Sequence, residues 1–495
     1  MLLRLLIITI LLLCAACPEC NAQMPIHLKV TEEQPPDSTD LERHNKKHFW
    51  RTAGEIVGFN GVLWTYDRYI RKGEFARISL HSVKENFRHG FKWDNDNLPT
   101  NTFLHPYNGN LYFNAARSNG FNFWQSELFA IGGSAMWEMF MEKEYPSTND
   151  IIATPIGGAA IGEILFRASD IVLKDCSTGA ERAGREIAVF LISPLRSINR
   201  ILTGEAWKWR PTTGRVFGVP NVGIQISAGF KMLHFNSKAS SMKLGATFQL
   251  NLEYGDRFEE YTHRPYDFFT MRADLSIIPS QPLLTQLNLM GRLLGREVVN
   301  SRKNQLNVGL YQHFDFFDSD TISKITKRVP YKLGIPASLG AGVMWRNTSA
   351  SNWTFDAYTH LNAIILGSSL SDHYRVNNRN YNFASGFGTK EGINAVFSRD
   401  RLSISLSHSF YRLFTWLGYR SGLDMETHNP GTLNVQGDKS VASFNIFEAR
   451  ANLKLWERLY LSFVFDYYHR NTLYRDYRDV KSTSLATRVM LTYKL

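Results

Sequence analysis

Cysteine is scarce in this sequence. Only four cysteines occur in 495 residues, and three of them, Cys14, Cys17 and Cys20, lie within the first 22 residues. If that segment is removed as a signal, Cys176 alone remains. An intramolecular disulfide and a cysteine-based metal site are then both excluded, and stability must come from packing and backbone hydrogen bonds.

Long hydrophobic runs are also missing after the N-terminus. The mean hydropathy is −0.25, whereas each span of a helical membrane protein needs about 20 continuous apolar residues. Residues 123–144 carry four glutamates, and the apolar stretch 151–166 is short and contains Pro155, so neither is expected to cross the inner membrane. The strands of a membrane β-barrel alternate apolar and polar residues, which is compatible with such an average.

The common catalytic motifs are absent as well. The sequence has no G-x-S-x-G nucleophile elbow, no H-E-x-x-H zinc motif and no phosphate-binding glycine-rich loop followed by lysine. His44 and His48 are one helical turn apart but lie beside two lysines, without a third ligand nearby. We therefore expect no metal and no cofactor, and the sequence leaves open whether the protein is an enzyme.

The charge balance is basic, with a formal net charge of +11. A basic surface attracts anionic partners, and the expected ones here are outer-membrane lipid and lipopolysaccharide; excess charge for solubility is the alternative. Lysine and arginine are scattered and no nucleic-acid-binding motif is present, so a nucleic-acid partner is not expected. Aromatic residues make up 13% of the chain, which suits either the aromatic girdles of a membrane barrel or a soluble aromatic core.

Residues 1–22 have the features of a cleaved secretory signal. Arg4 precedes the apolar run 5–13, and Ala22 is a small residue at the expected cleavage position. Lipidation at Cys17 is the alternative. The polar, proline-containing residues 23–45 are then expected to form a flexible periplasmic leader.

Residues 46–204 have a helical period. Apolar residues recur every three or four positions, which predicts a helical domain that is either periplasmic or a plug in the barrel. Glycine pairs such as Gly158 and Gly162 indicate closely packed helices. An Asn-, Pro- and Gly-rich loop is expected at 94–110, and residues 205–221 are expected to be a connector. The predicted helices cover 49–73, 75–91, 123–144, 151–173 and 186–202.

From residue 222 to 495 the period becomes two. Long segments with one wholly apolar face are typical of tilted membrane strands, and we expect an antiparallel barrel of about 12 strands. The overall class is therefore an α+β membrane protein, inserted with the help of the barrel-assembly machinery. An even strand count returns the C-terminus to the periplasm. The predicted strands start near residues 222, 242, 267, 285, 304, 331, 352, 383, 401, 441, 458 and 482.

The predicted inward face of the barrel carries charges of both signs, which need water or each other. The alternating pattern does not decide whether the lumen is open or filled by the helical domain. The predicted inward charges include Lys231, Arg272, Asp274, His313, Asp315, Glu448, Arg450, Asp466 and Arg488.

The densest group of polar residues within apolar helices lies at 105–170. The stretch HPYNGNLYFNAARSNG at 105–120, followed by Trp137-Glu138, PSTND at 146–150 and GGAAIGE at 157–163, resembles an uncharacterised family of Gram-negative outer-membrane proteins. The pattern is H-P-x-x-G-x-x-Y-F-N-x-x-R-S-N-G, then P-S-x-N-D and G-G-x-x-x-G-E. This resemblance implies an outer-membrane location and no defined activity.

Three hypotheses compete for this polar group. In the catalytic one, His105 is a general base or phosphate ligand, Arg117 holds an anionic head group, and Glu138 and Asp150 orient them or bind a divalent cation. In the structural one, Asp150 and Ser147 are helix caps, Glu138 pairs with Arg117, and Glu163 pairs with Arg167. In the third, the group binds a ligand without catalysis. The further candidates for ligand binding are Tyr112, Asn114, Ser118, Asn119, Ser147, Asn149, Thr154 and Glu163.

The sequence therefore favours an outer-membrane β-barrel protein with a helical domain, acting in transport or envelope organisation. The alternative is an outer-membrane enzyme that modifies lipid or lipopolysaccharide at a site in the helical domain.

Overall fold

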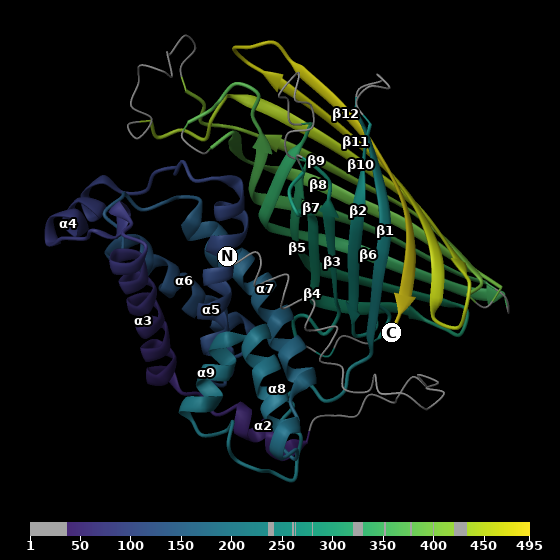
Figure 1. Ribbon diagram of the computed structural model, residues 1–495, viewed down its shortest axis with the longest axis horizontal. Coiled ribbons are helices and arrows are strands. Elements are labelled where there is room, and N and C mark those ends of the chain that lie inside the picture. The colour runs from purple at the N-terminus through teal and green to yellow at the C-terminus, as the bar shows by residue number, and fades with distance from the viewer. Residues whose placement is uncertain are drawn as a thin grey trace. The chain divides into compact units, whose positions relative to one another are not determined.

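The computed structural model describes residues 37–235, 242–259, 262, 264–279, 281–319, 330–350, 353–376, 379–398, 400–419 and 433–495. The chain divides into a helical unit and a β-barrel unit (Figure 1). The helical unit ends at Asn221 and omits Trp93–Thr102, which belong to the barrel unit together with Val222–Leu495. The predicted signal 1–22 and residues 23–36 of the predicted leader lie outside the described residues.

The helical unit is built around helix α5, which packs against α3, α6, α7 and α9. Short turns of other helical types, η1 (Tyr66–Ile70), η2 (Glu74–Ala76) and η3 (Thr100–Leu104), flank the α-helices. The α-helices are α2 (Ser38–His44), α3 (Phe49–Thr65), α4 (Leu80–His89), α5 (His105–Ser118), α6 (Phe123–Phe140), α7 (Asp150–Val172), α8 (Gly179–Ile192) and α9 (Pro194–Leu202).

Proline positions explain two differences from the predicted helices. The expected loop at 94–110 is wrong over its second half, because Pro106 lies in the first turn of α5, where its missing N–H costs nothing. The single helix expected at 186–202 is two, since Pro194 cannot continue α8 and instead begins α9.

The predicted leader and the predicted connector both contribute to the helical unit. Residues 38–44 of the leader form α2, where Asp40 accepts hydrogen bonds from Thr212 Oγ1 at 2.7 Å and from Gly214 N at 2.8 Å. Val216 N and Phe217 N of the connector both donate to Asp170 Oδ2 of α7. The Asp40 bonds tie the N-terminal helix to the connector, and the Asp170 bonds hold the connector against α7.

Glycines bring α5 and α7 into backbone contact. A Cβ added at Gly109 of α5 would lie 1.8 Å from Thr154 O, and one added at Gly158 of α7 would lie 2.5 Å from Gly109 C. A Cβ at Gly162 would lie 2.8 Å from the Phe113 ring. Close helix packing was predicted from Gly158 and Gly162 but not from Gly109, and the structure shows why larger residues would separate the two helices.

Helix α7 also has the length and composition of a membrane span, alone among the helices that the structure describes. The apolar stretch 151–166 looked too short for this in the sequence, but the helix extends to Val172. Most of its apolar window is buried inside the protein, which equally fits the central helix of a packed domain.

The barrel unit is a closed antiparallel sheet of twelve strands in the order β1-β12-β11-β10-β9-β8-β7-β6-β5-β4-β3-β2 (Figure 1). The predicted count is confirmed, and each strand begins within two residues of its predicted start. The strands are β1 (Val222–Phe235), β2 (Lys243–Tyr254), β3 (Phe269–Ile277), β4 (Leu284–Asn300), β5 (Asn304–Asp318), β6 (Lys332–Ala350), β7 (Trp353–Leu370), β8 (Tyr381–Phe397), β9 (Leu402–Phe414), β10 (Ser440–Lys454), β11 (Leu459–Tyr474) and β12 (Val480–Lys494).

Every strand of the barrel presents a large apolar side chain to the outside. A soluble barrel would bury such residues and place polar ones outside, so this barrel has the inverse polarity. One exposed example from each strand, in the order β1 to β12, is Phe230, Phe248, Ile277, Leu294, Leu310, Leu339, Leu361, Phe387, Leu406, Phe447, Phe463 and Leu491.

One level of the barrel interior is filled by apolar side chains. Tyr331, just before β6, stacks on Tyr468 of β11 with ring centroids 4.5 Å apart, although four strands separate β6 from β11 around the sheet. We call the buried residues around this pair the interior apolar cluster. Its members are Phe317, Tyr331, Leu333, Ile335, Ile364, Ala384, Tyr411, Leu413, Ala442, Phe444 and Tyr468.

A second level is bridged by charges. Arg272 of β3 contacts Glu448 of β10 at 2.6 Å, and Arg450 of β10 donates to Gln249 of β2. Four strands lie between β3 and β10, so these contacts cross the lumen. The predicted inward charges therefore neutralise each other. We call Arg272, Asp274, Glu448, Arg450, Asp466 and Arg488, with Gln249, the interior ionic network.

Segment 93–102 packs against the barrel rim opposite the start of β1. Arg379 Nη1 donates to Asp94 O at 2.7 Å, and Tyr381 OH donates to Asp96 O at 2.8 Å. Leu333 and Ile335 belong to the interior apolar cluster, so Gly334 between them faces outward. A Cβ at Gly334 would lie 2.5 Å from Thr102 Oγ1, which shows that the segment covers the outer face of β6.

The α5–α7 contact yields a prediction. We expect Gly158→Ala to destabilise the helical unit by about 1–3 kcal/mol or more, because backbone atoms of α5 must move. Gly132→Ala in α6 is the matched control, since nothing lies within 4 Å of its added Cβ. Its higher helix propensity should leave stability unchanged or raise it by up to about 1 kcal/mol. Thermal loss of the helical circular-dichroism signal measures both, and equal stability of the two variants would contradict the close contact.

Candidate functional site

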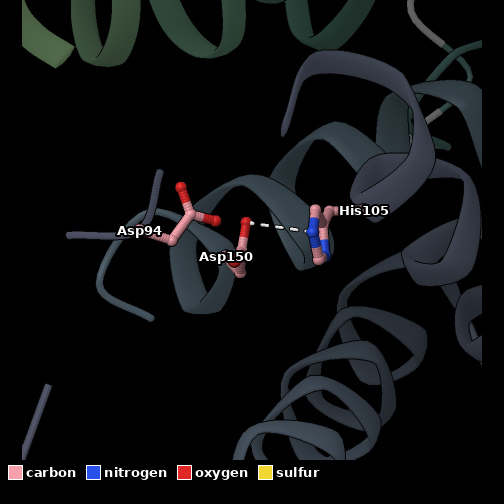
Figure 2. A group of neighbouring side chains, drawn as sticks. All are labelled: Asp94, His105 and Asp150. Atoms are coloured by element: carbon pink, nitrogen blue, oxygen red, sulfur yellow. Dashed lines mark ion pairs between the residues drawn. The ribbon is translucent and has the colours of Figure 1, made fainter. Parts of the chain in front are cut away.

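His105 and Asp150 form a pair at the N-termini of α5 and α7 (Figure 2). His105 Nε2 lies 3.6 Å from Asp150 Oδ1, and the side chains are 14% and 4% exposed. Asn149 Nδ2 donates to Asp150 Oδ1 at 2.9 Å, which fixes the carboxylate. Asp94, also drawn in Figure 2, belongs to segment 93–102 of the barrel unit.

Residues around the start of α7 support this pair. Asp150 N donates to Ser147 Oγ at 3.2 Å, so Ser147 satisfies a backbone N–H at the start of α7. The N-cap residue of the helix is Asn149, and Asp150 is its first residue rather than a cap. Glu138 Oε2 of α6 accepts from Ser147 N at 2.7 Å. Four of the predicted site residues, Glu138, Ser147, Asn149 and Asp150, are therefore brought together with His105.

Arg117 belongs to a different group. Its guanidinium binds Glu163 through two hydrogen bonds, from Nε at 2.7 Å and from Nη2 at 3.1 Å, and Arg167 donates to the same carboxylate at 2.9 Å. Arg117 follows His105 by twelve residues on α5, which is about 18 Å along a helix. The structure thus pairs Arg117 with Glu163 rather than with Glu138, and far from His105.

The other candidates are distributed through the bundle. Tyr112 OH donates to Asn60 Oδ1 at 2.5 Å, and burial raises the pKa of this tyrosine. Asn114 donates to Asn110 within α5, and Thr154 packs its carbonyl against Gly109. Asn119 Nδ2 donates to Glu55 Oε2 at 2.9 Å. Burial raises the pKa of Glu55, an effect that hydrogen bonds from Asn199 and Asn119 oppose.

A second set of buried ion pairs was not identified from the sequence. Arg196 of α9 contacts Asp170 of α7 at 2.5 Å, and Arg200 contacts Asp175 at 2.7 Å and Glu186 at 2.8 Å. The available signal was the i, i+4 spacing of Arg196 and Arg200 on a short amphipathic helix. Spacing within one helix does not reveal partners on another helix, so these pairs could not be predicted.

Glu127 of α6 is a titratable group with an unusual environment. Its Oε2 atom is buried and has no hydrogen-bond partner among the residues that the structure describes. Burial raises the pKa of this carboxyl to about 7. The ionised form is therefore penalised in the folded protein at neutral pH.

The His105–Asp150 pair is the part of the helical unit best suited to chemistry. A carboxylate beside an imidazole can orient the ring and favour its charged form, so that the ring accepts a proton from water or a hydroxyl. The 3.6 Å separation is longer than a hydrogen bond. Such distances are common in unliganded sites and shorten when substrate binds.

A sequence family described as a domain of unknown function, DUF3943, matches residues 90–195. The match covers α5, α6 and α7, and with them the His105–Asp150 pair and the Arg117–Glu163 pair. Among curated proteins, none matches this chain in sequence.

Solved outer-membrane channels resemble the barrel only distantly. The NanC porin is 10% identical with a TM-score of 0.27, and the similarity covers 55% of this chain and 100% of that one. The outer membrane channel DcaP of Acinetobacter baumannii is 8% identical with a TM-score of 0.23, covering 56% of this chain and 97% of that one. With values this low, the description of the barrel rests on its own strand pairing.

Glu127 yields a prediction about pH. Its pKa of about 7 in the fold exceeds its ordinary value of 4.5, so the folded state binds more protons and stability falls as pH rises from about 4.5 to 7. We expect Glu127→Gln to remove this fall, with a gain over wild type of up to about 3 kcal/mol above pH 7. Chemical denaturation of the helical unit at several pH values measures it.

Glu144→Gln is the control for the pH experiment, because the Glu144 side chain is 65% exposed. It should follow the wild-type pH dependence. If Glu127→Gln follows it too, the carboxyl of Glu127 is solvated and the assigned environment is wrong.

Proposed function

We propose that the protein is an outer-membrane barrel whose filled lumen makes it a membrane anchor for its helical domain, with a role in envelope organisation. The observation that carries this proposal is the pair of bridged levels inside the barrel, where Tyr331 meets Tyr468 and Arg272 meets Glu448 across the lumen. Transport by passive diffusion needs continuous water at those levels. Of the two roles expected from the sequence, envelope organisation is therefore favoured.

The outer-membrane location is supported by the polarity of the barrel. A closed sheet has no unpaired edge, and its exposed apolar residues occur on all twelve strands. These are the two requirements for a β-structure in hydrocarbon. Contact with lipopolysaccharide and delivery by the barrel-assembly machinery remain predictions that follow from this location.

The filled lumen predicts that the barrel does not conduct ions. In planar lipid bilayers, the folded full-length protein should give no steady conductance of the kind an open porin shows. A double variant, Arg450→Ala with Tyr468→Ala, shortens one side chain at each bridged level and should increase conductance. Heat-modifiable migration on gels confirms that each reconstituted protein is folded.

A steady ohmic conductance of the wild-type protein would overturn the anchor proposal in favour of a channel. Phe230→Ala with Phe463→Ala is the matched control, because both side chains are exposed on the outside of the barrel. This control variant should show no steady conductance, like the wild type.

A lipid-modifying enzyme is the second candidate, and the His105–Asp150 pair favours it. The imidazole is partly exposed and the carboxylate is held in place by Asn149. A general base at this position could activate water or a hydroxyl for transfer or hydrolysis of a lipid ester or phosphoester. Arg117 takes no part in this version of the proposal, because Glu163 binds its guanidinium.

The enzyme candidate predicts a change in lipid composition. We expect His105→Gln and Asp150→Asn, which keep size and hydrogen bonding, to fold as the wild type and to alter the outer-membrane lipid profile measured by mass spectrometry. His89→Gln is the control, since this histidine is about half exposed and its ion-pair partner is Glu85 rather than Asp150. An unchanged profile in both folded variants would eliminate the enzyme candidate.

A further inference from the structure

A polar pocket of about 260 Å³ lies within the helical unit, apart from the His105–Asp150 pair. It is lined by α2, the start of α3, the end of α5, α9 and the segment that follows α9. This volume is below the roughly 300–1,000 Å³ that drug-sized ligands occupy, so it suits a small group. We call it the basic pocket.

Most of the charged side chains around the basic pocket form ion pairs. Its carboxylates are all engaged by neighbouring arginines: Asp40 by Arg43, Asp175 by Arg200, and Glu205 by Arg210. Arg196, which also lines the pocket, is compensated by Asp170. The fixed charges of the inner wall therefore cancel one another.

Arg51 interacts at longer range with the Glu55 carboxylate, but it and one further cation stand outside the ion pairs that line the pocket. Lys46 and Arg51 line it, and neither forms an ion pair within the part of the chain that the structure describes. Burial and, after it, the charges of Arg51 and Lys46 lower the pKa of His48, another lining residue. A local excess of positive charge thus persists at the opening, where an anion would relieve it.

An unsatisfied donor lies in the same wall. Ser118, at the end of α5, lines the pocket, and its Oγ atom is buried without a hydrogen-bond partner among the described residues. A buried hydroxyl without a hydrogen bond lowers the stability of the fold unless a ligand or a water molecule forms a hydrogen bond with it. Lysine, arginine and a hydroxyl are together the usual donors to a phosphate group.

Exposed tryptophans adjoin the pocket residues in sequence. Trp50 precedes Arg51 and is 84% exposed, while Trp207 and Trp209 follow Glu205 and are 76% and 62% exposed. Leu202 of α9, beside the lining residue Thr203, is also exposed. Exposed tryptophan next to basic residues is typical of a protein surface at the interface of a lipid bilayer.

We propose that the basic pocket binds a phosphate group, and that this phosphate belongs to the head group of a membrane lipid whose acyl chains contact the exposed tryptophans. Lys46 and Arg51 supply charge and Ser118 supplies a hydrogen bond. The lipid source rests on the proposed outer-membrane location, whereas the phosphate site does not depend on it or on the state of the lumen.

Calorimetric titration of the full-length protein in detergent micelles tests the proposal with three probes. These are inorganic phosphate, dihexanoyl phosphatidic acid and dihexanoylglycerol, which lacks phosphate. We expect phosphatidic acid to bind most tightly, inorganic phosphate more weakly, and dihexanoylglycerol not to bind. The double variant Lys46→Ala with Arg51→Ala should lower the affinity for phosphatidic acid roughly tenfold or more. Ser118→Ala should lower this affinity by a smaller factor.

The matched control is Arg77→Ala with Lys84→Ala, which removes the same charge from exposed positions outside the pocket. It should bind phosphatidic acid as the wild type does, and helical circular dichroism shows that each variant is folded. Equal affinity for inorganic phosphate and phosphatidic acid would overturn the lipid assignment. The phosphate site itself would be overturned if neither inorganic phosphate nor phosphatidic acid bound to the wild-type protein. It would also be overturned if the folded Lys46/Arg51 double variant bound phosphatidic acid with unchanged affinity.

Discussion

The pairing of β1 with β12 is the constraint on which the barrel depends. The register runs from Gln225 with Lys494 to Phe235 with Ser484, and Leu495 N donates to Ile224 O at 2.8 Å beyond its end. Because this pairing leaves no unpaired edge, the outer surface can be apolar on every strand. The same closure brings β3 opposite β10, so inward charges on distant strands reach one another instead of water.

The helical unit depends in a similar way on one close approach. Gly109 and Gly158 allow α5 and α7 to touch through their backbones, and polar residues on both helices then fall into two separate groups. His105 and Asp150 meet at the N-terminal ends of the helices, while Arg117 meets Glu163 about three turns further along. The first group includes the partly exposed His105, whereas Arg117 and Glu163 are both buried, which separates a chemical role from a structural one.

The sequence predicted the barrel well and the helical contacts less well, for physical reasons. Alternation with period two marks the ends and faces of each strand, so the strand starts were placed within two residues. It does not show how far a side chain reaches, so Tyr331 stacking on Tyr468 across the lumen could not be foreseen. In the helices, the i, i+4 spacing identified the pairing of Glu163 with Arg167, whereas the structural hypothesis paired Arg117 with Glu138 and was wrong on that point. A partner on another helix depends on the crossing of two backbones, and Gly109 sets that crossing from within a stretch whose proline and asparagines indicated a loop.

The contact between segment 93–102 and the barrel rim has a consequence for the order of assembly. Asp94 and Arg379, which meet there, are 285 residues apart in the chain. The segment is synthesised and exported well before the strand it covers, and contacts of such long sequence separation form late because of the entropy of closing the loop. The outer face of β6 at Gly334 therefore stays uncovered until an N-terminal part of the chain returns to it. Maturation of this rim is a late step of folding, one that a barrel synthesised without its N-terminal region could not complete.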